Sequence, residues 1–226
     1  MRVPPAWVFL CALWAAAWQK RPLLAESSRF PYAGKRAEWG LAMQARGDGL
    51  TPDGLVFIDC EATSLARESY PVEVGLGWCG GRTESRLVRP AEAWAGIPWD
   101  PKSSAIHRIS PGELLTGGHG VREVAEWLNA ACSGFTVCSD NPDYDGHWLG
   151  VLFTAARMAV TFRLANSYRL AGIILQEEPD PKTMFLAAKA RVIAANPVTH
   201  RAGDDARFWA ALFSDLFAAR GDRNQG

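Results

Sequence analysis

The sequence predicts an α/β protein built on a mixed sheet. Two observations lead to this prediction. Segments with the patterns of strands come first and follow one another closely enough to form a meander. Segments with helical periodicity then alternate with one further strand along the rest of the chain.

Three strands are predicted from the apolar pattern after residue 50. Leu55 to Ile58 is a continuous apolar run behind the turn signal Pro52-Asp53-Gly54, which is typical of a strand buried on both faces. From Val72 to Trp78, apolar residues alternate with Glu or Gly, the period of a half-buried strand. Gly80-Gly81 then provides a turn, after which 83–88 can return as the third strand.

The second half of the chain is predicted to be mainly helical. Ser110-Pro111 with Glu113 indicates a helix start, because Ser suits the N-cap, Pro the first turn and Glu the capping box. The last helix carries an apolar stripe that includes Trp209 and Phe213. The other predicted elements are a helix at 120–132, a strand at 135–138, a helix starting within 142–146 and a helix at 182–195.

The composition indicates a folded protein. The chain has 226 residues, 48% apolar and 21% charged, which argues against a disordered chain, a collagen or a coiled coil. Lys plus Arg number 24, as do Asp plus Glu, so the chain lacks the bulk positive charge of a protein that coats DNA. Five cysteines without a C-x-x-C pair predict reduced thiols rather than a zinc ribbon or a disulfide framework.

The start of the chain allows three interpretations. Val3 to Gln19 carries no charge, is shorter than a membrane span and resembles a signal peptide. Export, an apolar arm packed on the domain or a membrane, and a start codon placed too far upstream, with Met43 the true start, all stay open. The predicted division of the chain is an extension at 1–50 that ends in a linker, a folded domain at 51–220 and a tail at 221–226.

Two carboxylates follow the first predicted strand. Asp59 and Glu61 are two residues apart, so on an extended chain their side chains point to the same face. Like charges at the exit of a buried strand need a positive partner, and hard oxygen ligands suit Mg²⁺ or Mn²⁺. The structural alternative is that Asp59 caps the next segment and Glu61 is solvated.

A second acidic cluster follows the strand predicted at 135–138. It contains Asp140, Asp143 and Asp145, and any of the three could face a metal. Asp145 is favoured because the apolar residues three, four and seven positions later form the face predicted to be buried. Helix capping is the alternative for all three.

A third cluster precedes the last helix. Asp205 lies four residues before Trp209 and shares its inward stripe, whereas Asp204 is offset and is expected to face solvent. Negative charge in the first turn of a helix is itself favourable, which is the alternative explanation. Because a histidine titrates near neutrality, His200 is a candidate for abstracting a proton from water.

Together, the three clusters resemble the DEDDh branch of the DnaQ-like 3′–5′ exonucleases. The first family motif, D-x-E before a small-residue turn, is matched by Asp59-Cys60-Glu61-Ala62-Thr63-Ser64-Leu65. The second is matched by Asn141-Pro142-Asp143-Tyr144-Asp145, and the third, H-x-A-x-x-D, by His200-Arg201-Ala202-Gly203-Asp204-Asp205. Residues 70–75 and 105–110 resemble two accessory segments, so the resemblance spans about residues 55–217.

The resemblance implies a ribonuclease H-like fold, in which a central five-stranded mixed sheet, its first three strands an antiparallel meander, is flanked by helices. It also implies metal-dependent hydrolysis at the 3′ end of single-stranded DNA or RNA, which releases nucleoside 5′-monophosphates. Two Mg²⁺ or Mn²⁺ ions would be bound by four carboxylates, and a histidine would be the general base. The implied catalytic residues are Asp59, Glu61, Asp145, His200 and Asp205, of which the four acidic residues are the metal ligands.

The substrate would need an apolar or aromatic platform. The candidates are Thr63, Leu65, Tyr144 and Trp148, with core packing the alternative for the aromatic residues. Arg67, Arg108 and Arg201 could contact phosphate, although a solvated side chain is the expectation for each.

The sequence departs from the family at two positions, with Asp140 where His is frequent and Arg108 where Gly is usual. These changes bear on substrate preference more than on catalysis. Alternatives to the leading function are an exoribonuclease or short-oligonucleotide hydrolase of the same family, and a non-catalytic nucleic-acid-binding module. Homodimers are common in the family, so a homodimer stays open. We expect a cytoplasmic protein without a stable membrane partner, unless residues 1–19 are a targeting segment.

Overall fold

The computed structural model describes residues 50–196 and 199–221. The interpretations of the apolar start and of Met43 therefore lie outside the described residues. The elements are, in order, η3 (Pro52–Gly54), β1 (Leu55–Ala62), β2 (Pro71–Trp78), β3 (Thr83–Leu87), η4 (Glu92–Trp94), α3 (Pro101–His107), α4 (Pro111–Gly117), α5 (Val121–Ala131), β4 (Thr136–Ser139), α6 (Pro142–Ala156), β5 (Leu164–Asn166), α7 (Ser167–Ile174), α8 (Pro181–Ala195) and α9 (Ala202–Gly221).

The sheet is mixed and has five strands in the order β3-β2-β1-β4-β5. Strands β1, β2 and β3 form an antiparallel meander, whereas β4 runs parallel to β1 and β5 parallel to β4. The predicted α/β class and the predicted meander are therefore confirmed. Because β1 and β4 are parallel neighbours, their carboxyl ends meet at the same edge of the sheet.

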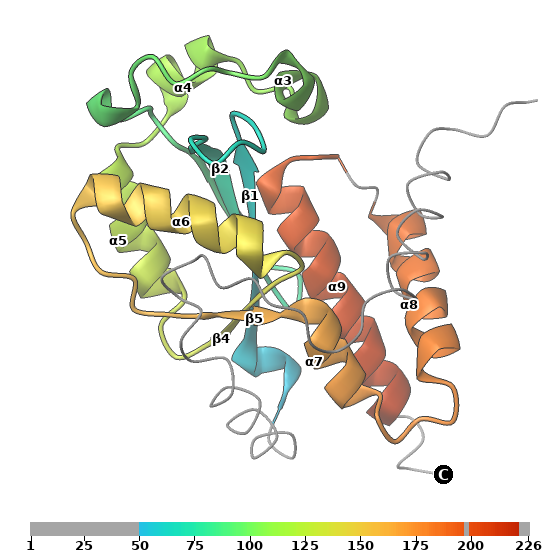
Figure 1. Ribbon diagram of the computed structural model, residues 1–226. Helices are drawn as coiled ribbons and strands as arrows, with labels where there is room; N and C mark the ends of the chain where they lie inside the picture. The colour runs from blue at the N-terminus through green and yellow to red at the C-terminus, as the bar shows by residue number, and fades with distance from the viewer. Residues whose placement is uncertain (1–49, 197–198, 222–226) are drawn as a thin grey trace, which may run out of the picture. The chain divides into compact units, whose positions relative to one another are not determined.

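The two faces of β1 have different partners. Val56 and Ile58 belong to the core cluster that includes side chains of α5 and α6. Phe57 points to the opposite face and packs on Phe213 of α9, with the ring centroids 4.7 Å apart. Figure 1 shows α6 and α9 on either side of the central strands. Since side chains alternate along a strand, Asp59 continues the face that Phe57 presents to α9.

Strand β2 is buried along its whole length, and not half-buried as its alternating pattern predicts. The residues between its large apolar side chains include Gly75 and Gly77, and α9 lies directly on both. A Cβ on Gly77 would come within 2.5 Å of the Ala206 carbonyl oxygen. Glycine on this face therefore indicates the close approach of a helix, and not exposure to solvent.

Capping residues fix where α3 and α4 begin and end. Ser110 caps α4 and forms the predicted capping box with Glu113, which hydrogen-bonds the Ser110 amide in return. Helix α3 is capped by Asp100 and ends at Arg108, whose φ of 59° is left-handed. That conformation favours glycine, so Arg108 holds a position that glycine would fill with less strain.

Two further sequence interpretations can be compared with the described residues. The four cysteines described there, Cys60, Cys79, Cys132 and Cys138, are all free, as predicted. In the same part of the chain, each helix is either too short or too polar to cross a bilayer.

Candidate active site

The candidate site begins at the end of β1. Asp59 lies opposite Gly75 and Glu61 opposite Glu73 in the antiparallel register with β2. Both carboxylates are partly covered, which is contrary to the alternative that Glu61 is simply solvated. Burial, together with the negative charge of Asp145, raises the pKa of Asp59 well above its ordinary value.

Asp145 comes to the same edge from α6. Strand β4 ends at Ser139, and α6 then starts at Pro142, so Asp145 is in the first turn of the helix. Its side chain is 3% exposed and accepts a hydrogen bond from the Ser139 hydroxyl. The amide and thiol of Cys60 at the end of β1 also direct hydrogen bonds to this carboxylate. These contacts fix Asp145 against both strands.

Asp205 reaches the site from α9, and His200 reaches it from the segment just before this helix. His200 precedes the helix with a left-handed φ of 56°. Its Nδ1 lies 3.9 Å from Oδ2 of Asp205, and 57% of its side chain is exposed. The other carboxylate oxygen of Asp205, Oδ1, is buried and has no hydrogen-bond partner in the part of the chain that is described. An orphaned carboxylate oxygen of this kind fits a cation ligand.

Two groups of potential ligands result. Glu61, His200 and Asp205 form the first, and Asp59, Asp140 and Asp145 form the second. Within each group the ligand atoms lie within 4.8 Å of one another. The structure therefore brings together all five residues that the family resemblance implies for catalysis.

Asp140 is the one carboxylate of these groups that the three motifs do not include. It directly follows β4 and so lies at a strand exit, but the helical spacing favours Asp145 as the ligand. Burial raises the pKa of Asp140, while Lys189 of α8 and the Trp209 indole of α9 act in the opposite direction. Lys189 and Trp209 thus connect the Asp140 carboxylate to α8 and α9.

The electrostatics of the site favour a bound cation. Burial is the largest effect, and it raises the pKa of Glu61 and of Asp145 to about 8 and that of Asp205 to about 6. The charge of Asp205 raises the pKa of Glu61 further. Raised pKa values indicate that no nearby positive charge stabilises the ionised form of these carboxyl groups. A divalent cation bound by their oxygens would supply that charge.

The four residues predicted to contact substrate divide into two exposed and two buried side chains. Leu65, the last residue of the first motif, is 69% exposed, and Tyr144, within the second motif, is 40% exposed. Thr63 is fully buried, and its hydroxyl accepts a hydrogen bond from the Tyr70 amide. Trp148 is 6% exposed, and its indole donates to the Ser69 hydroxyl at 2.8 Å. Thr63 and Trp148 therefore support the site from within the protein.

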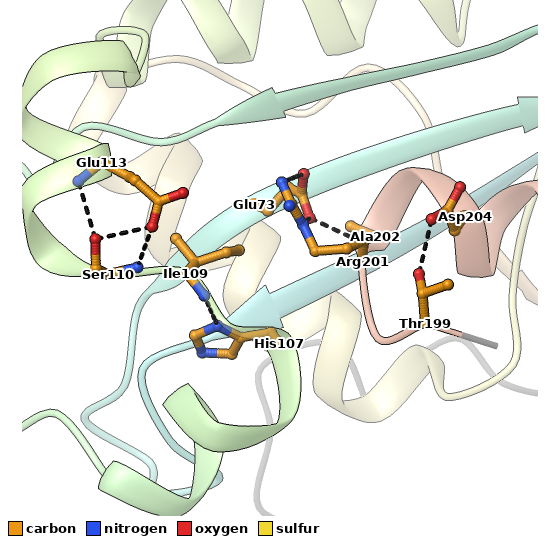
Figure 2. Close-up of polar contacts among 9 residues, drawn as sticks. All are labelled: Glu73, His107, Ile109, Ser110, Glu113, Thr199, Arg201, Ala202 and Asp204. Carbon is orange, nitrogen blue, oxygen red and sulfur yellow. Dashed lines mark hydrogen bonds and ion pairs between the residues drawn. The ribbon is translucent and has the colours of Figure 1, made fainter.

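The structure places Arg201 differently from the solvated side chain that the sequence predicts. Its guanidinium is paired with the buried Glu73 of β2 (Figure 2). His107, at the end of α3, is buried and accepts a hydrogen bond from the Ile109 amide at 3.0 Å. Neither side chain carries a pattern in the sequence that identifies its partner.

The comparisons with known proteins agree with this architecture. No family profile and no curated protein matches the chain. Among solved structures, exonuclease I of E. coli in complex with a dA16 oligonucleotide matches with a TM-score of 0.55 and 16% identity, over 75% of this chain and 41% of that one. The fold is ribonuclease H-like.

Two further structures show the same similarity. Exonuclease I of Methylocaldum szegediense matches with a TM-score of 0.54 and 16% identity, over 74% of this chain and 41% of that one. The zinc-bound form of the E. coli ExoI–ssDNA complex matches with a TM-score of 0.52 and 16% identity, over 75% and 41%. The chain thus spans about two fifths of the length of these exonucleases. The ribonuclease H-like fold predicted from the family resemblance is confirmed.

Proposed function

We propose that this protein is a metal-dependent 3′–5′ exonuclease of the DEDDh type. The observation that carries the proposal is the meeting of the two ligand groups, one around Glu61 and Asp205 and one around Asp59 and Asp145, at one edge of the sheet. The fold gives support, since solved structures that share it include an exonuclease bound to single-stranded oligonucleotides and one with bound zinc.

The proposed ligands are the four acidic residues of the DEDDh motifs, and the ions are two Mg²⁺ or Mn²⁺. All four offer carboxylate oxygens, which are the ligands that these ions prefer. The raised pKa values of Glu61 and Asp145 and the orphaned Oδ1 of Asp205 support this assignment. Cations held there would supply positive charge next to the phosphodiester under attack.

His200 is proposed as the general base. Because 57% of its side chain is exposed, the imidazole can take a proton from the attacking water and return it to solvent. Asp205, 3.9 Å from Nδ1, would orient the ring and stabilise its protonated form. His200 also belongs to the first ligand group, so its contribution to cation binding has to be measured separately.

The surface proposed for the terminal nucleotide is formed by Leu65 and Tyr144. Both side chains are exposed and close in sequence to proposed metal ligands, Leu65 four residues after Glu61 and Tyr144 directly before Asp145. Tyr144 packs on Trp148, with the ring centroids 5.5 Å apart, so the buried Trp148 supports the Tyr144 ring. A supported aromatic ring is a suitable platform for a base.

The decisive experiment is a degradation assay with 5′-labelled single-stranded DNA and RNA in the presence of Mg²⁺ or Mn²⁺. We expect a ladder of products shortened from the 3′ end, release of nucleoside 5′-monophosphates, and loss of the reaction in EDTA. The comparison of the two polymers measures the sugar preference directly.

Two variants make the assay specific. Asp59→Asn is expected to abolish degradation in a protein that keeps its fold. Asp143→Asn is the matched control, since Asp143 lies in the same helical turn as Asp145 but is exposed. If the wild-type protein binds both polymers and degrades neither, the site is a binding module and the proposal is wrong.

A further inference from the structure

Glu73 is a buried carboxylate that lies outside the proposed ligand set. It sits on β2 directly across from Glu61, and its side chain is 2% exposed. Its Oε2 accepts hydrogen bonds from Arg201 Nε and from the Ala202 amide, both at 2.9 Å, and its Oε1 accepts one from Arg201 Nη2 at 2.7 Å (Figure 2). We refer to the contacts of Glu73 with Arg201 and Ala202 as the clamp.

The clamp joins β2 to Ala202, the first residue of α9, and to Arg201 just before it. An ion pair of this kind adds little net stability, because the buried Glu73 carboxylate loses its hydration while the Arg201 side chain stays 41% exposed. Helix α9 already has another attachment, since Gly75 and Gly77 let its backbone lie directly on β2. The position of Asp205, one turn into the helix, is therefore secured without the clamp.

The backbone conformation of His200, in contrast, depends on the contacts of its neighbours. His200 is adjacent to Arg201 in the chain, mostly exposed, and held at a φ of 56°, which costs a non-glycine residue free energy. Such a conformation persists when contacts on neighbouring residues fix it. The bidentate contact of Arg201 with Glu73 provides a fixed point immediately after His200.

We propose that Glu73 and Arg201 are positioning residues that hold the backbone of His200 so that its imidazole lies against Asp205. The inference rests on the proposed function, because it assigns the clamp to the general base of that reaction. It also distinguishes Arg201 from a phosphate-binding arginine. A phosphate contact contributes to substrate binding, whereas the clamp contributes to the step in which water loses its proton.

The test is a kinetic double-mutant cycle between the clamp and His200. We expect Arg201→Gln to lower kcat about 100-fold with KM nearly unchanged, the size typical of a misplaced catalytic group. In the His200→Ala background, Arg201→Gln should lower kcat by less than about 2-fold, because the group it positions is absent. Equal losses of kcat in both backgrounds would overturn the inference, as would an increase in KM at constant kcat.

Further variants guard against a trivial loss of fold. Glu73→Gln/Arg201→Gln removes both charges, so no unpaired charge is left buried, and it should show the kcat of the single Arg201 variant. Arg201→Lys keeps the charge but not the two-point contact and should recover part of the loss. Arg191→Gln is the matched control, because Arg191 makes the same two-point contact with Asp215 on the surface of α8 and α9 and should keep full activity.

Hydrogen exchange of the metal-free protein gives a readout independent of activity. In Glu73→Gln/Arg201→Gln, the Ala202 amide should exchange at least about 10-fold faster, while amides in the middle of α9 keep their wild-type rates. Equal acceleration along α9 would show that the clamp holds the whole helix and would overturn the inference. An inactive wild-type protein overturns the proposed function and the inference with it. An active wild type with an unchanged Arg201→Gln variant overturns the inference alone.

Discussion

Gly75 of β2 lies directly beneath Ala202 at the start of α9. A Cβ on Gly75 would overlap the Ala202 carbonyl and the Gly203 amide nitrogen, both of which are backbone atoms that cannot move without moving the helix. The distance between the proposed ligands on β1 and those on α9 thus depends on a residue without a side chain.

Gly75→Ala is therefore expected to displace α9 from the sheet. The variant should lose several degrees in Tm and most of its nuclease activity, since Asp205 and His200 move with the helix. Thermal unfolding and the degradation assay measure the two effects. Gly150→Ala in α6 is the control, because a Cβ there meets no atom within 4 Å. It should raise the stability by up to about 1 kcal/mol, the gain of Ala over Gly in a helix.

The metal-free protein should become less stable as the pH rises. Burial raises the pKa of Glu61 and Asp145 to about 8 and that of Asp205 to about 6, from ordinary values of 4.5, 3.8 and 3.8. The folded state then binds more protons than the unfolded state between about pH 4 and pH 8, so the free energy of unfolding falls across that range.

Thermal melts in EDTA at a series of pH values test this relation. Asp145→Asn should flatten the decline, and saturating Mg²⁺ should raise Tm more at pH 8 than at pH 5. A metal-free protein that becomes more stable between pH 5 and pH 8 would contradict the account of the site as uncompensated carboxylates.

His200→Ala should reduce kcat about 10²–10⁴-fold, the usual contribution of a general base. The four carboxylates remain, so affinity for Mn²⁺, measured by calorimetry, should change little. A large loss of Mn²⁺ affinity with the same relative activity at saturating Mn²⁺ would make His200 a ligand and not a base.

Substitutions of Tyr144 and of Trp148 should have different effects, although the two rings are in contact. Tyr144→Ala removes an exposed ring and should weaken binding of single-stranded oligonucleotide by about 1–3 kcal/mol, with little change in Tm. Trp148→Phe removes the hydrogen bond to Ser69 inside the protein and should lower Tm with little change in KM. Fluorescence anisotropy and thermal unfolding measure the pair, and the reverse pattern would place Trp148 in the substrate surface.

Arg108→Gly should stabilise the protein. Arg108 ends α3 in the left-handed region, where an L side chain costs about 1 kcal/mol and glycine is tolerated. Glu126→Gly, at an exposed position in the middle of α5, is the opposite control and should lower stability by about the same amount. Urea unfolding of both variants measures whether each free energy of unfolding rises or falls.

The elements that could be predicted from the sequence are those with a long, regular pattern. β1, β2 and α5 begin within a residue of the predicted positions, because each carries either a continuous apolar run, an alternation or a helical stripe. β5 has three residues, which is too short to show a period, and α7 follows it immediately.

In the candidate site, too, features with a local sequence pattern could be predicted and those without one could not. The carboxylates of Asp59, Glu61, Asp145 and Asp205 could be expected to meet, because short motifs at strand exits and helix starts fix where such residues lie. The partner of Arg201 could not be expected, because Glu73 lies far away in the chain and becomes its neighbour only when α9 rests on two glycines of β2. Tertiary contacts of this kind leave no local pattern.

The wide spacing of the site residues along the chain affects when activity can arise during synthesis. Asp59 and Glu61 leave the ribosome early, Asp145 follows midway, and Asp205 arrives with the last helix. A nascent chain in which α9 has not yet settled on β2 lacks Asp205 and His200 at the site, so under the proposed function it is expected to be inactive. Under the proposed function, completion of the fold is what switches the nuclease on.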